Sequence, residues 1–149
     1  MSRLVRIVYC SRSRVTGSRG EVEMQIRQIL ATARTKNPEL HVTGAMTFNE
    51  NCFAQVLEGS AEDLGPLFKR ICRDPRHSDV KVLERTAPAH RVFPRWSMAY
   101  VDPPQGDGRH PLAHFSFEGA LTAGAAPEAE LLLGDLRRII VTGSKLAAS

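Results

Sequence analysis

Two hydrophobic periodicities alternate along the first two thirds of the chain, and their order leaves few possible folds. Alternating apolar residues predict strands, whereas apolar residues three and four apart predict helices. The predicted strands span residues 4–10, 41–48, 52–58, 80–85 and 96–101, and the helices span about 20–35 and a segment after Ser60. The order β-α-β-β-α-β-β is close to the ferredoxin-like split βαβ arrangement, which packs both helices on one face of a sheet. We therefore expect an α/β domain of this class.

Local signals predict where the two helices begin and end. Ser18 followed by Glu21 fits a capping box, which marks the start of a helix. Asn37-Pro38 predicts that the first helix stops there, because the residue before a proline avoids the helical region. Pro66 would remove a backbone hydrogen bond in the second turn of the second helix. That helix is therefore expected to have an irregular first turn or a later start.

The last third of the chain has a different composition. Residues 102–111, DPPQGDGRHP, are typical of a linker, and Pro127 can open a helix at its first position. The apolar side of that helix would consist of Leu132, Leu133, Leu136, Ile139 and Ile140. It needs cover from the free face of the sheet or from another subunit. We expect a domain at 1–101, followed at 102–149 by a linker and a C-terminal helical extension without a separate effector domain.

Composition excludes several classes of protein. The 149 residues suit one domain, and no stretch of about 18 apolar residues predicts a membrane span. The N-terminus lacks a small-residue cleavage site, so we expect a cytoplasmic protein. Three cysteines without CxxC spacing predict neither a disulfide framework nor a metal site. The net charge of +4 invites a nucleic-acid partner, but the basic residues are scattered, so we do not expect one.

Polar residues occur on strand faces that should be buried. Tyr9 alternates with apolar residues in the first strand, and Gln55 lies between Phe53 and Leu57 in the third. A buried amide without partners costs about 1–3 kcal/mol, so Gln55 must be hydrogen-bonded. A core hydrogen bond to Tyr9 or Trp96 would satisfy it, and so would a ligand. Strand periodicity leaves both alternatives open.

A second polar cluster follows the second helix in the run KRICRDPRH. Arg70 and Asp74 are four residues apart, so they could form an ordinary surface ion pair worth about 0.3–0.5 kcal/mol. His77 lies nearby and could be a ligand or a switch. The sequence contains no GxGxxG, Walker, HExxH or GxSxG motif, so no enzyme class is indicated. These residues predict an α/β domain whose polar core groups could surround a planar ligand.

At these same positions the sequence resembles the BLUF family, the sensors of blue light using flavin. The matching runs are LVRIVYCS, ILATARTKNPELHVTGAM, FAQVLEG, RICRDPRH and RVFPRWSM, in family order over about residues 3–100. The resemblance implies a flavin bound without a covalent bond between the two helices, with its ring edge facing the sheet. FAD is the expected form, with FMN and riboflavin as alternatives.

The resemblance also implies a photochemical role for three residues. Tyr9 matches the photoactive tyrosine, which donates an electron and then a proton to the excited ring. Gln55 matches the glutamine that bridges this tyrosine and the N5/O4 edge of the flavin. Asn37 matches the asparagine that hydrogen-bonds the O4/N3 edge.

Five further residues match positions around the flavin or on the signalling strand. Arg70 and Asp74 match residues on the O2/N3 side, and His77 lies beside them near the ribityl or ring end. Trp96 and Met98 match the pair on the fifth strand whose rearrangement relays the signal. Which of that pair faces the flavin in the dark stays open.

The implied function is that of a photoreceptor and not of an enzyme. We expect it to signal to a downstream protein partner or through a homo-oligomer. The alternatives are a flavin-dependent redox enzyme and a basic nucleic-acid-binding module. Two departures from the family pattern stand out, His41 where glycine is common and Gly65-Pro66 in the second helix.

Overall fold

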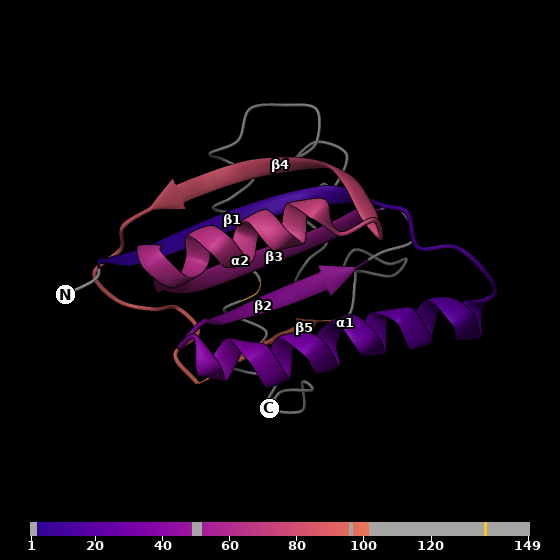
Figure 1. Ribbon diagram of the computed structural model, residues 1–149, viewed down its shortest axis with the longest axis horizontal. Coiled ribbons are helices and arrows are strands. Elements are labelled where there is room, and N and C mark those ends of the chain that lie inside the picture. Colours follow the sequence, from indigo (N-terminus) through magenta and orange to yellow (C-terminus); the bar gives the residue numbers. More distant parts are fainter. Residues whose placement is uncertain (1–2, 49–51, 96, 102–135, 137–149) are drawn as a thin grey trace.

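The computed structural model describes residues 3–48, 52–95, 97–101 and 136, which form one five-stranded sheet with two helices on one face (Figure 1). The elements are β1 (Leu4–Ser13), α1 (Arg19–Glu39), β2 (Thr43–Phe48), β3 (Cys52–Ser60), α2 (Ala61–Arg73), β4 (His77–Thr86) and β5 (Ala99–Val101). The sheet order is β4-β1-β3-β2-β5. The predicted α/β class and the order of its elements are confirmed. No helix in the described part is long and apolar enough to cross a membrane.

Strand register aligns the polar core residues that the sequence singled out. β1 pairs antiparallel with β3 and β4, β3 pairs antiparallel with β2, and β5 pairs parallel with β2. Tyr9 lies opposite Gln55, and Gln55 lies opposite Met46. Because side chains alternate between faces, these three form one row on the face that the helices cover. The adjacent strands β2 and β3 pair as a hairpin, whose turn at 49–51 lies outside the described residues.

The start of α1 follows the sequence prediction. The Ser18 side chain accepts a hydrogen bond from the Glu21 backbone N–H at 3.2 Å, and the Glu21 carboxylate accepts one from the Ser18 N–H at 3.1 Å. This reciprocal pair is the capping box. It satisfies two backbone donors that a helix start would otherwise leave unpaired.

The predicted end of α1 is wrong, because the helix continues through Pro38 to Glu39. The His41 N–H donates to the Pro38 carbonyl at 3.2 Å, and the Val42 N–H donates to the Asn37 carbonyl at 2.9 Å. These are the two bonds of a Schellman cap, and His41 adopts its left-handed conformation with φ of 54°. The cap pairs the carbonyl groups of Asn37 and Pro38, which the end of a helix would otherwise leave without a backbone donor.

The irregular or delayed start predicted for α2 is also wrong. Ser60 caps the helix by accepting the Asp63 N–H at 3.2 Å, and helical structure begins at Ala61. Gly65 explains why Pro66 is tolerated, because the proline ring has no preceding Cβ to clash with. The helix therefore keeps its direction along the sheet.

Strand β5 is shorter than predicted. It spans Ala99–Val101 rather than 96–101, and Ser97 and Met98 precede it in bent backbone. Trp96 lies outside the described residues. Ser97 and Met98 are nevertheless buried, because side chains of α1 bind their carbonyl groups as described below.

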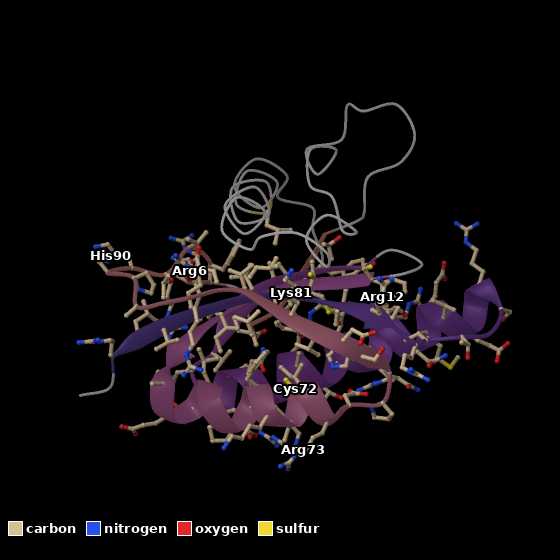
Figure 2. All side chains as sticks on the ribbon, turned by 90° about the horizontal axis from the view of Figure 1, so that it is seen from above. Arg6, Arg12, Cys72, Arg73, Lys81 and His90 are labelled. Atoms are coloured by element: carbon tan, nitrogen blue, oxygen red, sulfur yellow. The ribbon has the colours of Figure 1, made fainter. Side chains whose placement is uncertain are left out.

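Glu58 holds the segment between β4 and β5 against the sheet. Its carboxylate is fully buried and accepts hydrogen bonds from Arg6 Nε at 3.0 Å, the Val92 N–H at 2.9 Å and the Phe93 N–H at 2.8 Å. Arg6 also reaches the His90 carbonyl at the same end of the sheet (Figure 2). A buried carboxylate with three donors is compatible with a folded core, whereas an unpaired one would not be. Glu58 is the last residue of the strand predicted at 52–58, and no sequence pattern indicated this role.

The sheet face opposite the two helices is also buried. Its fully buried side chains include Val8, Cys10, Ala45, Ala54 and Val56. Leu136, from the predicted C-terminal helix, is helical and fully buried. The predicted linker and the rest of that helix lie outside the described residues.

Two glycine-to-alanine variants should have opposite effects on stability. A Cβ at Gly44 would lie 2.0 Å from the Val56 carbonyl oxygen, so Gly44→Ala should cost about 1–3 kcal/mol through overpacking. A Cβ at Gly20, in the first turn of α1, meets nothing within 4 Å. Gly20→Ala should therefore add about 0.5 kcal/mol by restricting the unfolded chain. Urea unfolding measures both, and a Gly44→Ala protein of unchanged stability would contradict this packing of β2 on β3.

Candidate functional site

A cavity of about 300 Å³ lies between the two helices and the sheet. Its floor consists of Tyr9, Met46, Phe53, Gln55 and Leu57. Ile29 and Ala33 line it from α1, and Leu67 and Ile71 line it from α2. A slot with apolar walls and a few polar groups is the usual form of a small-molecule site. This one suits a flat ligand with apolar faces and a hydrogen-bonding edge.

The structure brings six of the predicted site residues together at this cavity. They are Tyr9, Asn37, Gln55, Arg70, Asp74 and His77. Met98 does not line the cavity but is buried in the same core cluster, where it contacts Gln55, and Trp96 lies outside the described residues. Lys36 and Arg76 also line the cavity, and sequence reasoning missed both. Two features of the sequence could have indicated them, because Lys36 directly precedes Asn37 and Arg76 lies within the run RDPRH.

Gln55 uses both ends of its amide inside the core. The Tyr9 hydroxyl donates to Gln55 Oε1, and Gln55 Nε2 donates to Met98 Sδ at 3.4 Å. All three side chains are buried. The core hydrogen bond between Tyr9 and Gln55 is therefore present, yet both residues also line the cavity. The two alternatives left open by the strand periodicity do not exclude each other.

The environment of Tyr9 keeps its hydroxyl protonated. Burial raises the pKa of Tyr9 well above its usual value, and the nearby Cys72 and Asp74 raise it further. Its ring packs edge-on against Phe68, with centroids 5.4 Å apart. At neutral pH the hydroxyl is thus a fixed donor to Gln55.

Two residues of α1 bind the backbone beside Met98. Asn37 Nδ2 donates to the Ser97 carbonyl at 2.8 Å, and Arg34 Nε donates to the Met98 carbonyl at 3.0 Å. Asn37 is buried and also lines the cavity. A ligand that contacts Asn37 would therefore touch a residue that holds the start of β5.

The ion pair that the i, i+4 spacing of Arg70 and Asp74 allowed is absent among the described residues. Asp74 instead binds Arg76, whose Nε lies 2.9 and 3.0 Å from the two carboxylate oxygens. Asp74 is the C-cap of α2, and its carboxylate also accepts the Arg76 N–H at 2.9 Å, so the turn after the helix brings Arg76 to it. The hydrogen bonds from Arg76 lower the pKa of Asp74 and keep it ionised.

His77 connects three elements at one end of the cavity. Its Nε2 lies 2.5 Å from the Ile71 carbonyl, and its Nδ1 lies 2.8 Å from Ser11 Oγ. A carbonyl can only accept, so Nε2 donates to Ile71, whereas the Ser11 hydroxyl can pair with Nδ1 as donor or as acceptor. The ring meets Tyr9 and Phe53 edge-on, so His77 braces the cavity wall.

Comparisons with known proteins agree with this geometry. The family described as "Sensors of blue-light using FAD" (BLUF) matches residues 4–99. The dark-state structure of BlrB, a BLUF protein, is 29% identical, with a TM-score of 0.73 over 96% of this chain and 98% of that one. The ground-state structure of BlsA is 27% identical, with a TM-score of 0.74 over 90% of this chain and 87% of that one.

Curated relatives share part of the chain. The blue light- and temperature-regulated antirepressor BluF of Escherichia coli K12 is 38% identical over 68 residues, 45% of this chain. The photoactivated adenylate cyclase subunit beta of Euglena longa is 30% identical over 98 residues, 65% of this chain. The matches span 17% and 11% of the lengths of these two relatives.

The raised pKa of Tyr9 predicts a loss of stability at alkaline pH. The unfolded state ionises first as the pH rises, so the contribution of the neutral phenol is complete below about pH 10 and is lost above it. The difference in unfolding free energy between the wild type and Tyr9→Phe should be constant from about pH 7 to 9. At about pH 11 it should shift by about 1.4 kcal/mol against the wild type. Urea unfolding across this range measures it, and a pH-independent difference would contradict the burial of the phenol.

Proposed function

The chain belongs to the BLUF family, the sensors of blue light using FAD, and on this premise we propose that Tyr9, Gln55 and Met98 form the light-responsive centre of a photoreceptor. BLUF domains bind flavin and have a signalling role. This favours a sensor over the flavin-dependent enzyme and the nucleic-acid-binding module. The observation that carries the proposal is the Gln55 amide, which contacts Tyr9, Met98 and the cavity at once.

The cavity fits a flavin ring, with FAD as the proposed form. The apolar side chains of α1 and α2 would flank its faces. The buried amides of Asn37 and Gln55 supply donors and acceptors for one polar edge, and Arg70 and Asp74 would hold the other. When bound, a flavin supplies a chromophore that absorbs blue light and accepts an electron once excited.

Gln55 is the proposed switch because an amide offers a donor at one corner and an acceptor at the other. Tyr9 is the proposed electron and proton donor, and its hydroxyl donates a hydrogen bond to Gln55 Oε1. Rotation or tautomerisation of the amide would exchange the groups that Gln55 presents to its neighbours. Rotation would place the amide oxygen opposite Met98 Sδ, which has no proton to donate, so the Gln55–Met98 hydrogen bond would be lost.

The loss of that bond would reach the start of β5. Ser97 and Met98 are held by Asn37, Arg34 and Gln55, and β5 itself pairs with β2 through a short parallel ladder. A switch requires an element with two arrangements of similar free energy, and a short strand held mainly by side chains meets this need. We propose that residues 1–101 are the sensor and that 102–149 pass the signal to a partner protein or to a second copy of the chain.

Removal of the Tyr9 hydroxyl or of the Gln55 amide should abolish the light response. We expect the flavin-loaded wild type to show a small, reversible red shift of its absorption under blue light. Tyr9→Phe and Gln55→Leu should bind flavin but show no red shift, because each variant breaks the hydrogen bond between Tyr9 and Gln55.

Tyr100→Phe is the matched control, because it also removes one phenol hydroxyl. It should keep the response, since Tyr100 does not line the cavity. Dark and illuminated absorption spectra measure all four proteins. A full red shift in Tyr9→Phe would contradict its role as the donor.

The hydrogen bond from Arg34 to the Met98 carbonyl should limit the movement of β5. Arg34→Met removes a charged donor from the Met98 carbonyl, so amide exchange at 97–101 should rise about tenfold in the dark. The further increase in amide exchange that light causes should be smaller in Arg34→Met than in the wild type. Arg27→Met, on an exposed position of the same helix, is the control and should behave as wild type. Equal dark exchange in Arg34→Met and the wild type would exclude Arg34 from this role.

A further inference from the structure

A second hollow, of about 380 Å³, lies where α1 ends and β2 begins. The segment between β4 and β5 passes this end of α1 and forms the opposite wall (Figure 1). The described residues that line the hollow are Pro38, His41, Val42, Thr43, Arg91, Pro94, Arg95 and Ser97. None of these residues also lines the cavity between the helices, so the two hollows are separate sites.

The described lining of this hollow is basic and contains no carboxylate. Arg91 Nη1 donates to Thr43 Oγ1 at 2.8 Å and to the Glu58 carbonyl at 3.0 Å. Both acceptors are uncharged, so neither neutralises the guanidinium group. Arg95 is exposed, and its side chain forms no ion pair within the described part of the chain. The exposed His41 adds an imidazole, so the hollow suits an anionic ligand.

The end of helix α1 does not account for these charges. The carbonyl groups at the end of a helix carry about half a negative charge and attract cations in the last turn. Lys36 is the basic residue in the last turn of α1, and the N–H groups of the Schellman cap already bind the last carbonyls. Glu39 is exposed next to the hollow but does not line it. The two arginines therefore remain available to a ligand.

The hollow includes part of the segment that the proposed switch would release. Ser97 lines it, and the following residue, Met98, binds the Gln55 amide. Arg91 is fixed to β2 and β3 by its hydrogen bonds, whereas Arg95 lies two positions before Ser97. A movement of the backbone at 97–98 would thus change the spacing between the two guanidinium groups.

We propose that this hollow is a docking site for an acidic segment of a partner protein, and that blue light weakens the docking. The inference rests on the proposed photoreceptor function and adds a partner contact within the sensor itself. A guanidinium group binds a carboxylate through two parallel hydrogen bonds, so Arg91 and Arg95 suit neighbouring Asp or Glu side chains. A segment that fits their spacing in the dark would bind less tightly once that spacing changes.

Binding of a tetraglutamate peptide with blocked ends tests this proposal. The flavin-loaded full chain, labelled with ¹⁵N, is titrated with the peptide in the dark and under blue light. In the dark at low salt, the peptide should shift the amide signals of His41, Arg91 and Arg95. The shifts should vanish at ~1 M salt, where exposed charges are screened. Under blue light the affinity should fall about threefold.

Each other outcome overturns a defined part of the proposal. Absence of these shifts, the same shifts with tetraglutamine, or equal affinity for inorganic phosphate would overturn the docking site. Equal affinity in the dark and in the light, in a protein that shows its red shift, would overturn the control by light. Docking in the dark by a protein without any red shift would overturn the proposed function and leave the docking site standing.

Arg95 is the residue to change, because its side chain is exposed and its loss leaves no described partner unpaired. Arg95→Gln should weaken tetraglutamate binding about threefold in the dark and keep the red shift. Arg95→Lys should retain most of the affinity. Arg85→Gln makes the same change in net charge at an exposed position on β4 and should bind as the wild type does. Equal losses in Arg95→Gln and Arg85→Gln would reduce the effect to net charge and overturn the docking site.

Discussion

The buried amide of Gln55 is the group on which the rest of the site depends. An amide in this position would cost about 1–3 kcal/mol without partners, and it finds them on two different elements, Tyr9 on β1 and Met98 before β5. Each partner needs its own support. The β1–β3 register places Tyr9 opposite Gln55, and the hydrogen bonds from Arg34 and Asn37 hold the backbone at Met98. The same contacts therefore satisfy the core and link the cavity to β5.

The two faces of the sheet cooperate in placing Met98. On the face opposite the helices, Glu58 binds the Val92 and Phe93 amides and so directs the chain toward β5. On the helix side, Asn37 holds the same segment by donating a hydrogen bond to the Ser97 carbonyl. A buried carboxylate is costly unless its hydrogen bonds are complete, which explains why Glu58 has both backbone and arginine donors. Met98 thus belongs to a segment that is hydrogen-bonded from both faces of the sheet.

Local sequence rules succeeded where the relevant atoms lie within one turn of the chain. The capping box of Ser18 and Glu21 formed as predicted, because its two hydrogen bonds join residues three apart. The rules failed at the prolines. Helix α1 continues past Pro38 and ends in the Schellman cap at His41. In α2, Gly65 makes Pro66 compatible with the helix. The ion pair that spacing allowed between Arg70 and Asp74 is absent, because Arg76 binds the Asp74 carboxylate.

The sequence by itself determined which faces of the strands and helices are apolar, and its period-two pattern placed Tyr9 and Gln55 on buried faces. Resemblance to BLUF proteins then predicted which of the polar residues would contact a flavin. Only the tertiary structure decided which polar side chains form hydrogen bonds with each other. The bonds from Gln55 to Tyr9 and to Met98 join residues 46 and 43 positions apart. Such contacts depend on strand register and on closure of the segment before β5. No local pattern encodes them, since they form only when distant elements pack together.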